Sequence, residues 1–209
     1  MRLAVVANKQ LKDELCLTGI DKNCTIEWFD NPSNVTVDFN GVIDLLFEEE
    51  NHDITILQRF LPTPVIINSV CKTIAELGAP FVRINGWPGF LNRNIAEVAC
   101  PAGTDISQFE KILTAFNKRP QWVPDIKGFV SLRVLSMIIN EAYFALDEKV
   151  STKSEIDTAM KLGTNYPYGP FEWSEKIGLE KIANLLFALS KNEKRYTPSE
   201  LLIKELSQR

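Results

Sequence analysis

The chain has 209 residues, of which 45% are hydrophobic and 24% are charged, a composition typical of globular proteins rather than disordered or fibrous ones. Its formal net charge of -4 at pH 7 argues against a general electrostatic grip on nucleic acid or on an acidic membrane surface. No apolar run approaches the roughly 20 residues that a membrane-spanning helix needs, and the start, MRLAVVANKQ, is expected to be a strand rather than a signal peptide, so we expect a cytoplasmic protein.

The first part of the chain alternates short apolar runs with helical or loop pieces. The apolar runs are rich in branched and aromatic side chains, which suits strands buried on both faces of a sheet. The expected strands are residues 2–7, 25–29, 42–47, 64–68, 81–84 and 96–100. Residues 9–15, 53–60 and 71–77 have some helical spacing between these strands. The alternation predicts a mostly parallel α/β layer fold for residues 1–124.

One helix in this part is clearly amphipathic. It is expected at 105–118, where Asp105 and Gln108 are spaced as a capping box. Its apolar stripe consists of Phe109, Ile112, Leu113 and Phe116.

The pattern becomes entirely helical in residues 125–209. Helices are expected at 129–149, 151–163, from 169 onward, 179–191 and 197–206. The starts and stops that indicate them are Thr152 with Glu155, Gly163, Pro170, and Thr197 with Glu200. The helix at 129–149 is apolar almost all round, so a small helical domain has difficulty covering it. We therefore expect a homodimer through these helices; the alternative is that the α/β part covers the helix.

Cysteine and histidine give few chemical signals. Cys16, Cys24, Cys71 and Cys100 lie far apart without a Cys-x-x-Cys spacing, and we interpret them as reduced thiols rather than metal ligands or disulfides. No metal site is predicted. His52 is the single histidine, in the acidic run EEENHD, and is expected to be a solvated loop residue.

A stretch of the helical part, NEAYFALDEKVSTKSEIDTAMKLGTNYPYGPFEWSEKIGLE, resembles the C-terminal domain of the 3-hydroxyacyl-CoA dehydrogenase family. The matching motifs stand at Asn140–Ala142, Glu155–Asp157, Lys161–Phe171 and Gly178–Glu180. The aromatic turn at 161–173 is expected to be structural, with its rings filling the wedge between helices. The resemblance implies a Rossmann-like N-terminal domain, an NAD cofactor and a role in fatty-acid or acyl-CoA metabolism.

The resemblance implies a Gly-rich turn after the first strand, and this turn is missing. The chain reads VVANKQLKDE there, with Ala7, Lys9 and Leu11 or Lys12 about where glycines would stand. Their side chains would obstruct the close approach of a pyrophosphate, so we expect NAD to bind weakly or not at all. Asp30, after the second strand, suits the acidic ribose ligand of a dinucleotide site, but equally a residue that starts a turn before Asn31 and Pro32.

The middle of the N-terminal domain is shorter than the resemblance implies, because a long helical excursion after the second strand is replaced by NPSNVTVDFNG. The remnant of the motif that follows the excursion is Val42, Ile43, Asp44 and Glu48.

The catalytic positions implied by the resemblance are mostly substituted. In IINSVCK, Asn68 is retained, Ser69 stands where Thr is usual, and Val70 takes the catalytic Ser position, although a shift of one residue would bring Ser69 there. In RINGWPG, Asn85 stands at the position of the catalytic His, with Trp87 in an aromatic slot. Glu97, in AEVAC, keeps the carboxylate that would orient this His. An amide does not accept a proton at neutral pH.

The hinge that leads into the helical domain has two possible placements. One is KGFVSLR, with Leu132 in place of the usual Asn and Arg133 retained. The other is WPGFLNR, with Asn92 and Arg93, but Pro101 and Gly103 would end a following helix too soon. The first placement is therefore preferred.

Three functional hypotheses follow. The chain is a family member that retains the fold, with an acyl-CoA as a possible ligand, while hydride transfer is lost. Alternatively it is an active NAD-dependent dehydrogenase with an unusual site, in which Glu97 acts directly. A third alternative is a non-catalytic subunit or regulator of acyl-CoA enzymes.

Overall fold

The computed structural model describes residues 1–36 and 38–208, and its chain divides into two compact units, Met1–Phe129 and Val130–Arg209. The first unit is an α/β domain and the second is all-helical, so the predicted fold class is confirmed. Within the described residues, no helix is long and apolar enough to cross a membrane.

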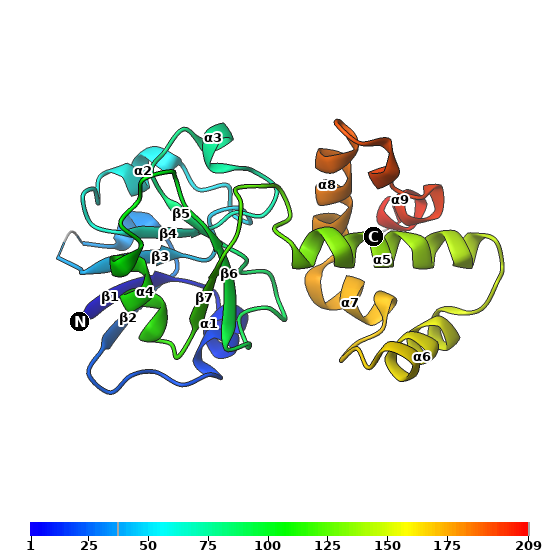
Figure 1. Cartoon of the computed structure of the whole chain (residues 1–209), viewed down its shortest axis with the longest axis horizontal. Helices are drawn as coiled ribbons and strands as arrows, with labels where there is room; N and C mark the ends of the chain where they lie inside the picture. The colour runs from blue at the N-terminus through cyan, green and yellow to red at the C-terminus, as the bar shows by residue number, and fades with distance from the viewer. Residues whose placement is uncertain (37, 209) are drawn as a thin grey trace. The chain divides into compact units, whose positions relative to one another are not determined.

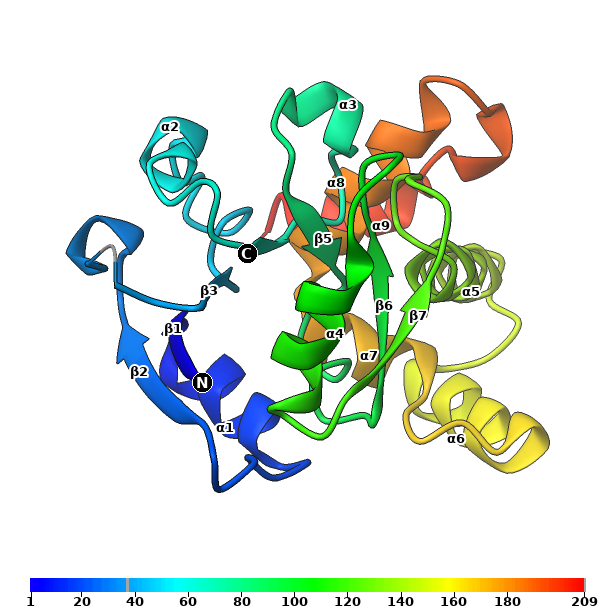
Figure 2. The ribbon, with the colours of Figure 1, turned by 60° about the vertical axis from the view of Figure 1, so that its left-hand side comes forward.

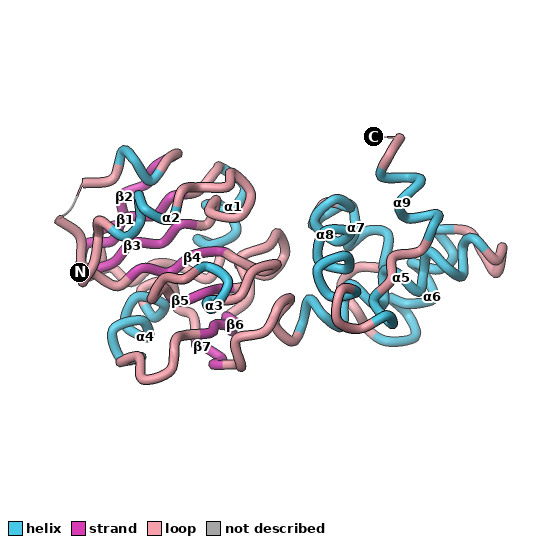
Figure 3. Tube along the Cα trace, turned by 90° about the horizontal axis from the view of Figure 1, so that it is seen from above, coloured by secondary structure: helices cyan, strands magenta, loops and turns pink. Residues whose placement is uncertain are grey.

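The first unit is built on one seven-stranded sheet with the order β2-β1-β3-β4-β5-β6-β7, and Figure 3 shows these strands side by side. All neighbouring strands are parallel except β5 and β6. The chain therefore runs from β1 to one side and returns to place β3 on the other side of β1, as in Rossmann-like folds. The strands are β1 (Arg2–Val6), β2 (Thr25–Phe29), β3 (Gly41–Asp44), β4 (Val65–Asn68), β5 (Val82–Ile84), β6 (Ile95–Ala99) and β7 (Arg119–Trp122).

Two strands differ from the sequence prediction by more than one residue at an end. β3 ends at Asp44 because its carboxylate accepts a hydrogen bond from Leu46 N, which turns the chain three residues before the predicted end. β7 was not predicted, since its sequence RPQW contains Pro120 and has no apolar run. It pairs with β6 at the edge of the sheet, a position that tolerates proline.

The helices of this unit pack on a core made by the central strands, whose apolar side chains are almost fully buried. Figure 2 shows α4 lying against the sheet beside β7. The predicted stripe of α4, with Phe116 just beyond the helix, is buried as expected. Asp105 is its N-cap, and the carboxylate of Asp105 accepts a hydrogen bond from Ser107 N. The helices are α1 (Lys9–Cys16), α2 (Ile54–Gln58), α3 (Ile74–Leu77) and α4 (Ile106–Thr114), with a 3-10 turn at Pro32–Asn34.

The second unit is arranged around the long helix α5 (Ser131–Asp147), which packs against α7, α8 and α9 (Figure 1). Leu132, Ile139 and Tyr143 are among its fully buried side chains, whereas Val134 is half exposed. The other helices are α6 (Lys153–Thr164), α7 (Pro170–Ile177), α8 (Leu179–Ser190) and α9 (Glu200–Leu206), with a 3-10 turn at Lys194–Tyr196.

The helix boundaries confirm some signals and correct others. The capping box of Thr152 and Glu155 is present, and Pro170 occupies the first turn of α7. The N-cap of α9 is Ser199 rather than Thr197, because Ser199 Oγ accepts the hydrogen bond from Leu202 N. Helix α6 runs through Gly163 and ends at Thr164, and its C-cap Asn165 adopts the left-handed conformation.

The aromatic turn between α6 and α7 is held by a carboxylate. Asp157 of α6 accepts hydrogen bonds from the backbone N–H groups of Phe171, at 2.8 Å, and Glu172, at 3.3 Å, and so caps the N-terminus of α7. A Cβ atom at Gly169 would overlap Asp157, so this close approach requires glycine. The ring of Phe171 lies edge-on to Tyr143 of α5, with centroids 5.0 Å apart. These contacts give the turn a structural role.

Candidate functional site

The candidate site lies at the carboxyl ends of β4 and β5, where the chain leaves neighbouring parallel strands. Asn85 follows β5 directly, and its backbone N–H bonds to the carbonyl of Glu97 on the antiparallel strand β6. This pairing brings the two side chains together: Asn85 Nδ2 donates to Glu97 Oε2 at 3.1 Å. The structure thus joins two of the residues that the sequence singled out, with an amide in contact with the carboxylate.

The side chain of Asn68, the last residue of β4, forms hydrogen bonds to the segments that follow β5 and β3. Its Oδ1 accepts from Gly86 N at 3.0 Å, and its Nδ2 donates to Leu45 O at 3.1 Å. A Cβ at Gly86 would stand 2.9 Å from Asn68 Cγ, so glycine permits this bond. Asn68 therefore ties three segments together, and both ends of its amide are engaged.

Ser69 is buried, and its hydroxyl forms no hydrogen bond with Asn85. Its Oγ donates to Lys72 O at 3.2 Å, within the tight loop that follows β4. The neighbouring Val70 is fully buried. The Ser69 hydroxyl is therefore engaged within the loop and is not bonded to the Asn85–Glu97 pair.

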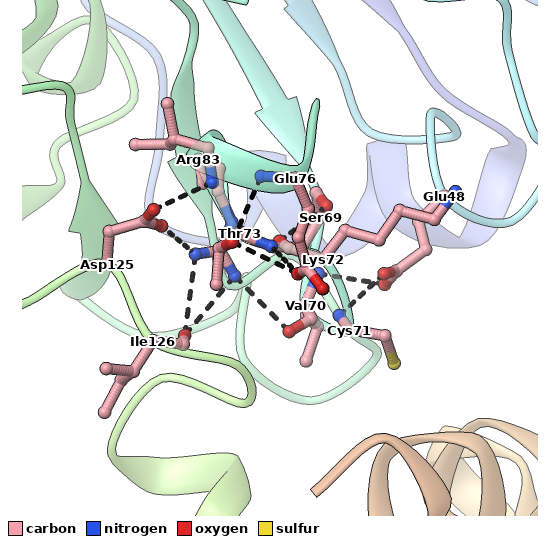
Figure 4. Close-up of polar contacts among 11 residues, drawn as sticks. Glu48, Ser69, Val70, Cys71, Lys72, Thr73, Glu76, Arg83, Asp125 and Ile126 are labelled. Carbon is pink, nitrogen blue, oxygen red and sulfur yellow. Dashed lines mark hydrogen bonds and ion pairs between the residues drawn. The ribbon is translucent and has the colours of Figure 1, made fainter. Parts of the chain in front are cut away.

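The carboxylate of Glu48 binds the loop that follows β4, as Figure 4 shows. Its carboxylate accepts from the consecutive backbone N–H groups of Val70, at 2.9 Å, and Cys71, at 2.6 Å. It also accepts from Trp87 Nε1 at 3.3 Å. Two adjacent N–H groups form an anion-binding nest, and here the anion is a side chain of the same chain.

Arg83, which is fully buried within β5, lies on the opposite side of this loop from Glu48 (Figure 4). Its guanidinium pairs with Asp125, donates from Nε to Ser69 O at 2.9 Å and from Nη2 to Val70 O at 3.3 Å. The sequence analysis did not single out this residue. A charged side chain inside the otherwise apolar strand sequence FVRI was the available signal, because a buried charge requires partners.

The connection from β1 to α1 consists of Ala7 and Asn8. Asn8 is the N-cap of α1: its Oδ1 accepts from Leu11 N at 3.0 Å. Lys12 lies over the ring of Trp28 at 4.8 Å. The helix start thus holds a capping side chain where a Gly-rich cradle would leave backbone N–H groups open. These residues do not fit a closely held pyrophosphate.

Asp30 lies beside this connection, because β2 and β1 are parallel neighbours and Ala7 N bonds to Phe29 O. It is exposed, and its Oδ1 accepts from Asn34 Nδ2 at 3.0 Å. The position after β2 is that of a ribose ligand in dinucleotide sites. The contact with Asn34 is that of a residue in a turn, so both interpretations of Asp30 have support.

His52 is not the solvated residue that the sequence predicted. Its Nδ1 lies 2.7 Å from Asp44 Oδ2, and only 7% of its side chain is exposed. The hydrogen bond to Asp44 raises the pKa of His52, and burial raises the pKa of Asp44. The sequence prediction missed this partner because it considered only the acidic run around His52, whereas Asp44 lies eight residues upstream at the end of β3.

The comparisons with known proteins identify relatives of the helical part of the chain. Residues 128–208 match the family described as 3-hydroxyacyl-CoA dehydrogenase, C-terminal domain. Residues 128–208 are a domain of this family. The match starts at Gly128, which agrees with the hinge at KGFVSLR, and α5 follows directly.

Among curated relatives, 3-hydroxyadipyl-CoA dehydrogenase of Escherichia coli K12 is 45% identical over 82 residues, which are 38% of this chain and 17% of that protein. A 3-hydroxybutyryl-CoA dehydrogenase of Bradyrhizobium diazoefficiens is 32% identical over 115 residues, covering 53% of this chain and 39% of that protein. The chain thus spans well under half the length of either relative.

The fold extends over the whole chain. The crystal structure of (S)-3-hydroxybutyryl-CoA dehydrogenase from Ralstonia eutropha matches 99% of this chain and 93% of that chain with a TM-score of 0.76. The identity in that comparison is 19%, so the likeness concerns the fold. The Rossmann-like first unit and the helical second unit are therefore the architecture of 3-hydroxyacyl-CoA dehydrogenases.

Proposed function

We propose that this chain is a 3-hydroxyacyl-CoA dehydrogenase relative that binds an acyl-CoA but has lost hydride transfer. The observation that carries the proposal is the contact of Asn85 with Glu97. The family resemblance implies a His at this position, where it takes the hydroxyl proton as hydride leaves. By that resemblance the Asn85 amide takes the place of the His beside the Glu97 carboxylate, yet an amide has no basic nitrogen.

Loss of the proton acceptor has a large expected effect on rate. General base catalysis contributes about 10²–10⁴-fold to such reactions. His52, the single histidine, is engaged by Asp44 through Nδ1 and follows β3 rather than β5. These facts support assigning no proton acceptor to the position beside Glu97.

Weak or absent NAD binding is the second part of the proposal. Asn8 caps α1, and no glycine stands between β1 and the first turn of that helix. Asp30 would still stand where an adenosine ribose could reach it, so any residual affinity is expected from that edge. Without a held dinucleotide, hydride transfer has no acceptor.

Turnover of acetoacetyl-CoA with NADH tests the proposal directly. We expect the wild-type rate to lie at least about 10²-fold below an ordinary enzyme rate of about 10 s⁻¹. Asn85→His and, as a control at an exposed position, Asn94→His are measured alongside. Wild-type turnover at ordinary rates would overturn the proposal, and its loss in Glu97→Gln would then favour direct action of Glu97.

A titration with NADH, followed by fluorescence or by melting temperature, separates binding from chemistry. We expect no clear saturable shift at micromolar NADH. A saturable shift would restore the dinucleotide site and leave only the proton acceptor missing. Titration with CoA and butyryl-CoA tests the acyl-CoA part of the proposal independently of NADH.

We also propose a homodimer through the helices of the second unit. The support is a set of exposed apolar side chains on these helices: Val134 at 53%, Phe144 at 39% and Phe187 at 44% exposure. Light scattering after size exclusion should give twice the chain mass of 23.7 kDa. Val134→Glu or Phe187→Glu should shift the mass toward the monomer, whereas a monomeric wild type would contradict the proposal.

A further inference from the structure

In the Asn85 amide, the nitrogen is hydrogen-bonded and the oxygen is not. Asn85 is 3% exposed, and its Nδ2 donates to Glu97 Oε2. Among the residues that the structure describes, its buried Oδ1 accepts no hydrogen bond. An ionised carboxylate only accepts hydrogen bonds, so the NH₂ group must face Glu97 and the amide oxygen must point elsewhere.

Three donors of the segment 85–87 are already engaged elsewhere. The backbone N–H of Gly86 bonds to Asn68, and the indole N–H of Trp87 bonds to Glu48. The N–H of Asn85 itself bonds to the carbonyl of Glu97. A buried acceptor without a donor is unfavourable, and native proteins leave few of them. A donor brought by a ligand or by water would satisfy it.

The chemistry of this atom differs from that of an imidazole. A ring nitrogen of histidine donates or accepts according to its tautomer, whereas an amide oxygen only accepts. A hydroxyl group can donate to it. A ketone oxygen has no hydrogen to donate, and it would place a second acceptor against the first.

We propose that Asn85 determines specificity by accepting a hydrogen bond from a ligand hydroxyl, so that the site binds a 3-hydroxyacyl thioester in preference to its 3-oxo counterpart. This inference rests on the proposed acyl-CoA binding. It assigns to the Asn85–Glu97 pair a binding role that needs no proton transfer: Glu97 orients the amide, and the amide oxygen selects the donor.

The test is a calorimetric titration of the wild-type protein with 3-hydroxybutyryl-CoA, acetoacetyl-CoA and butyryl-CoA. We expect the hydroxyl compound to bind about tenfold or more tightly than the ketone, because one hydrogen bond is gained and one repulsion is avoided. Butyryl-CoA, which has neither group, should lie between them. Equal affinities of all three would overturn the inference and leave the proposed function standing; absence of any binding would overturn both.

Two variants identify the residue responsible. Asn85→Leu has a similar volume without the acceptor and should abolish the preference, whereas Asn94→Leu, at an exposed position, should keep it. Asn85→His restores a group that can donate, so the ratio of the two affinities should fall toward one. An unchanged ratio in a folded Asn85→Leu or Asn85→His protein would show that another group selects the hydroxyl and would refute the role of Asn85.

Discussion

Asp157 Oδ1 accepts a 2.8 Å hydrogen bond from the backbone N–H of Phe171, so a carboxylate on one helix caps the start of the next. The two residues lie 14 positions apart, and each is the last residue of a motif that resembles the dehydrogenase family, Glu155–Asp157 and Lys161–Phe171. The family motif is thereby explained as a packing unit: the aspartate, the glycine that admits it and the phenylalanine that packs on α5 require one another.

Gly169→Ala is expected to destabilise the protein by about 1–3 kcal/mol, because the new Cβ overlaps Asp157 and forces the two helices apart. Urea denaturation monitored by circular dichroism measures this loss. Gly163→Ala is the matched control: nothing lies within 4 Å of a Cβ there, the residue is helical, and alanine should be neutral or stabilising by up to about 1 kcal/mol. Equal effects of the two substitutions would contradict the packing role of Gly169.

Arg83→Met should destabilise the first unit by about 3 kcal/mol or more, since it removes a fully buried guanidinium and leaves Asp125 and the Ser69 carbonyl without their partner. Arg2→Met breaks an exposed pair with Glu27 and should change stability by about 1 kcal/mol or less. Both are compared by the urea midpoint of unfolding. If the two variants unfold at similar midpoints, Arg83 does not organise the loop after β4.

Asn8→Ala is expected to lower stability by about 1 kcal/mol through loss of the α1 N-cap, whereas Asn8→Asp should preserve it, because aspartate is an equally good cap. Thermal unfolding with and without NADH measures both effects. The nucleotide should leave all three proteins unchanged. Stabilisation by NADH that is present in the wild type and absent in Asn8→Ala would instead assign Asn8 to a nucleotide site.

Stability should fall as the pH rises from about 6.5, the ordinary pKa of histidine. The hydrogen bond to Asp44 raises the pKa of His52, so in this range the folded protein holds a proton that the unfolded chain releases. Unfolding midpoints between pH 6 and 8 should show the decline, and His52→Gln should remove it. The measurements stop at pH 8 because burial lowers the pKa of Lys118 to about 8. Above that pH, deprotonation of Lys118 in the folded protein makes stability rise with pH. A wild type as pH-independent as His52→Gln would contradict the ion pair.

Local patterns were sufficient for most of the fold. Continuous apolar runs marked six strands, and the capping box of Thr152 and Glu155 marked the start of α6. β7 was not predicted, because an edge strand buries few apolar side chains and can contain a proline such as Pro120. Ser199 is the cap although Thr197 has Glu200 three residues later. The backbone N–H of Ser199 bonds to Asn140 Oδ1 of α5, a tertiary contact that local spacing does not reveal.

The candidate site was predictable in part. The family resemblance indicated Asn85 and Glu97, and strand pairing brings them together. The roles of Glu48 and His52 depend on loops that fold back over neighbouring strands, and sequence spacing does not encode such returns. Arg83 was open to prediction, since a charge within a buried strand implies a partner, but the partner Asp125 lies 42 positions away.

The proline of β7 has a consequence for how copies of this protein can meet. The backbone N–H groups of Arg119 and Val123 point toward β6, so the place of the missing N–H of Pro120 faces outward from the sheet. A foreign strand approaching this border would find a gap in the donor row that it needs. Intermolecular sheet extension is therefore discouraged on this side, which guards the α/β unit against aggregation through β-augmentation.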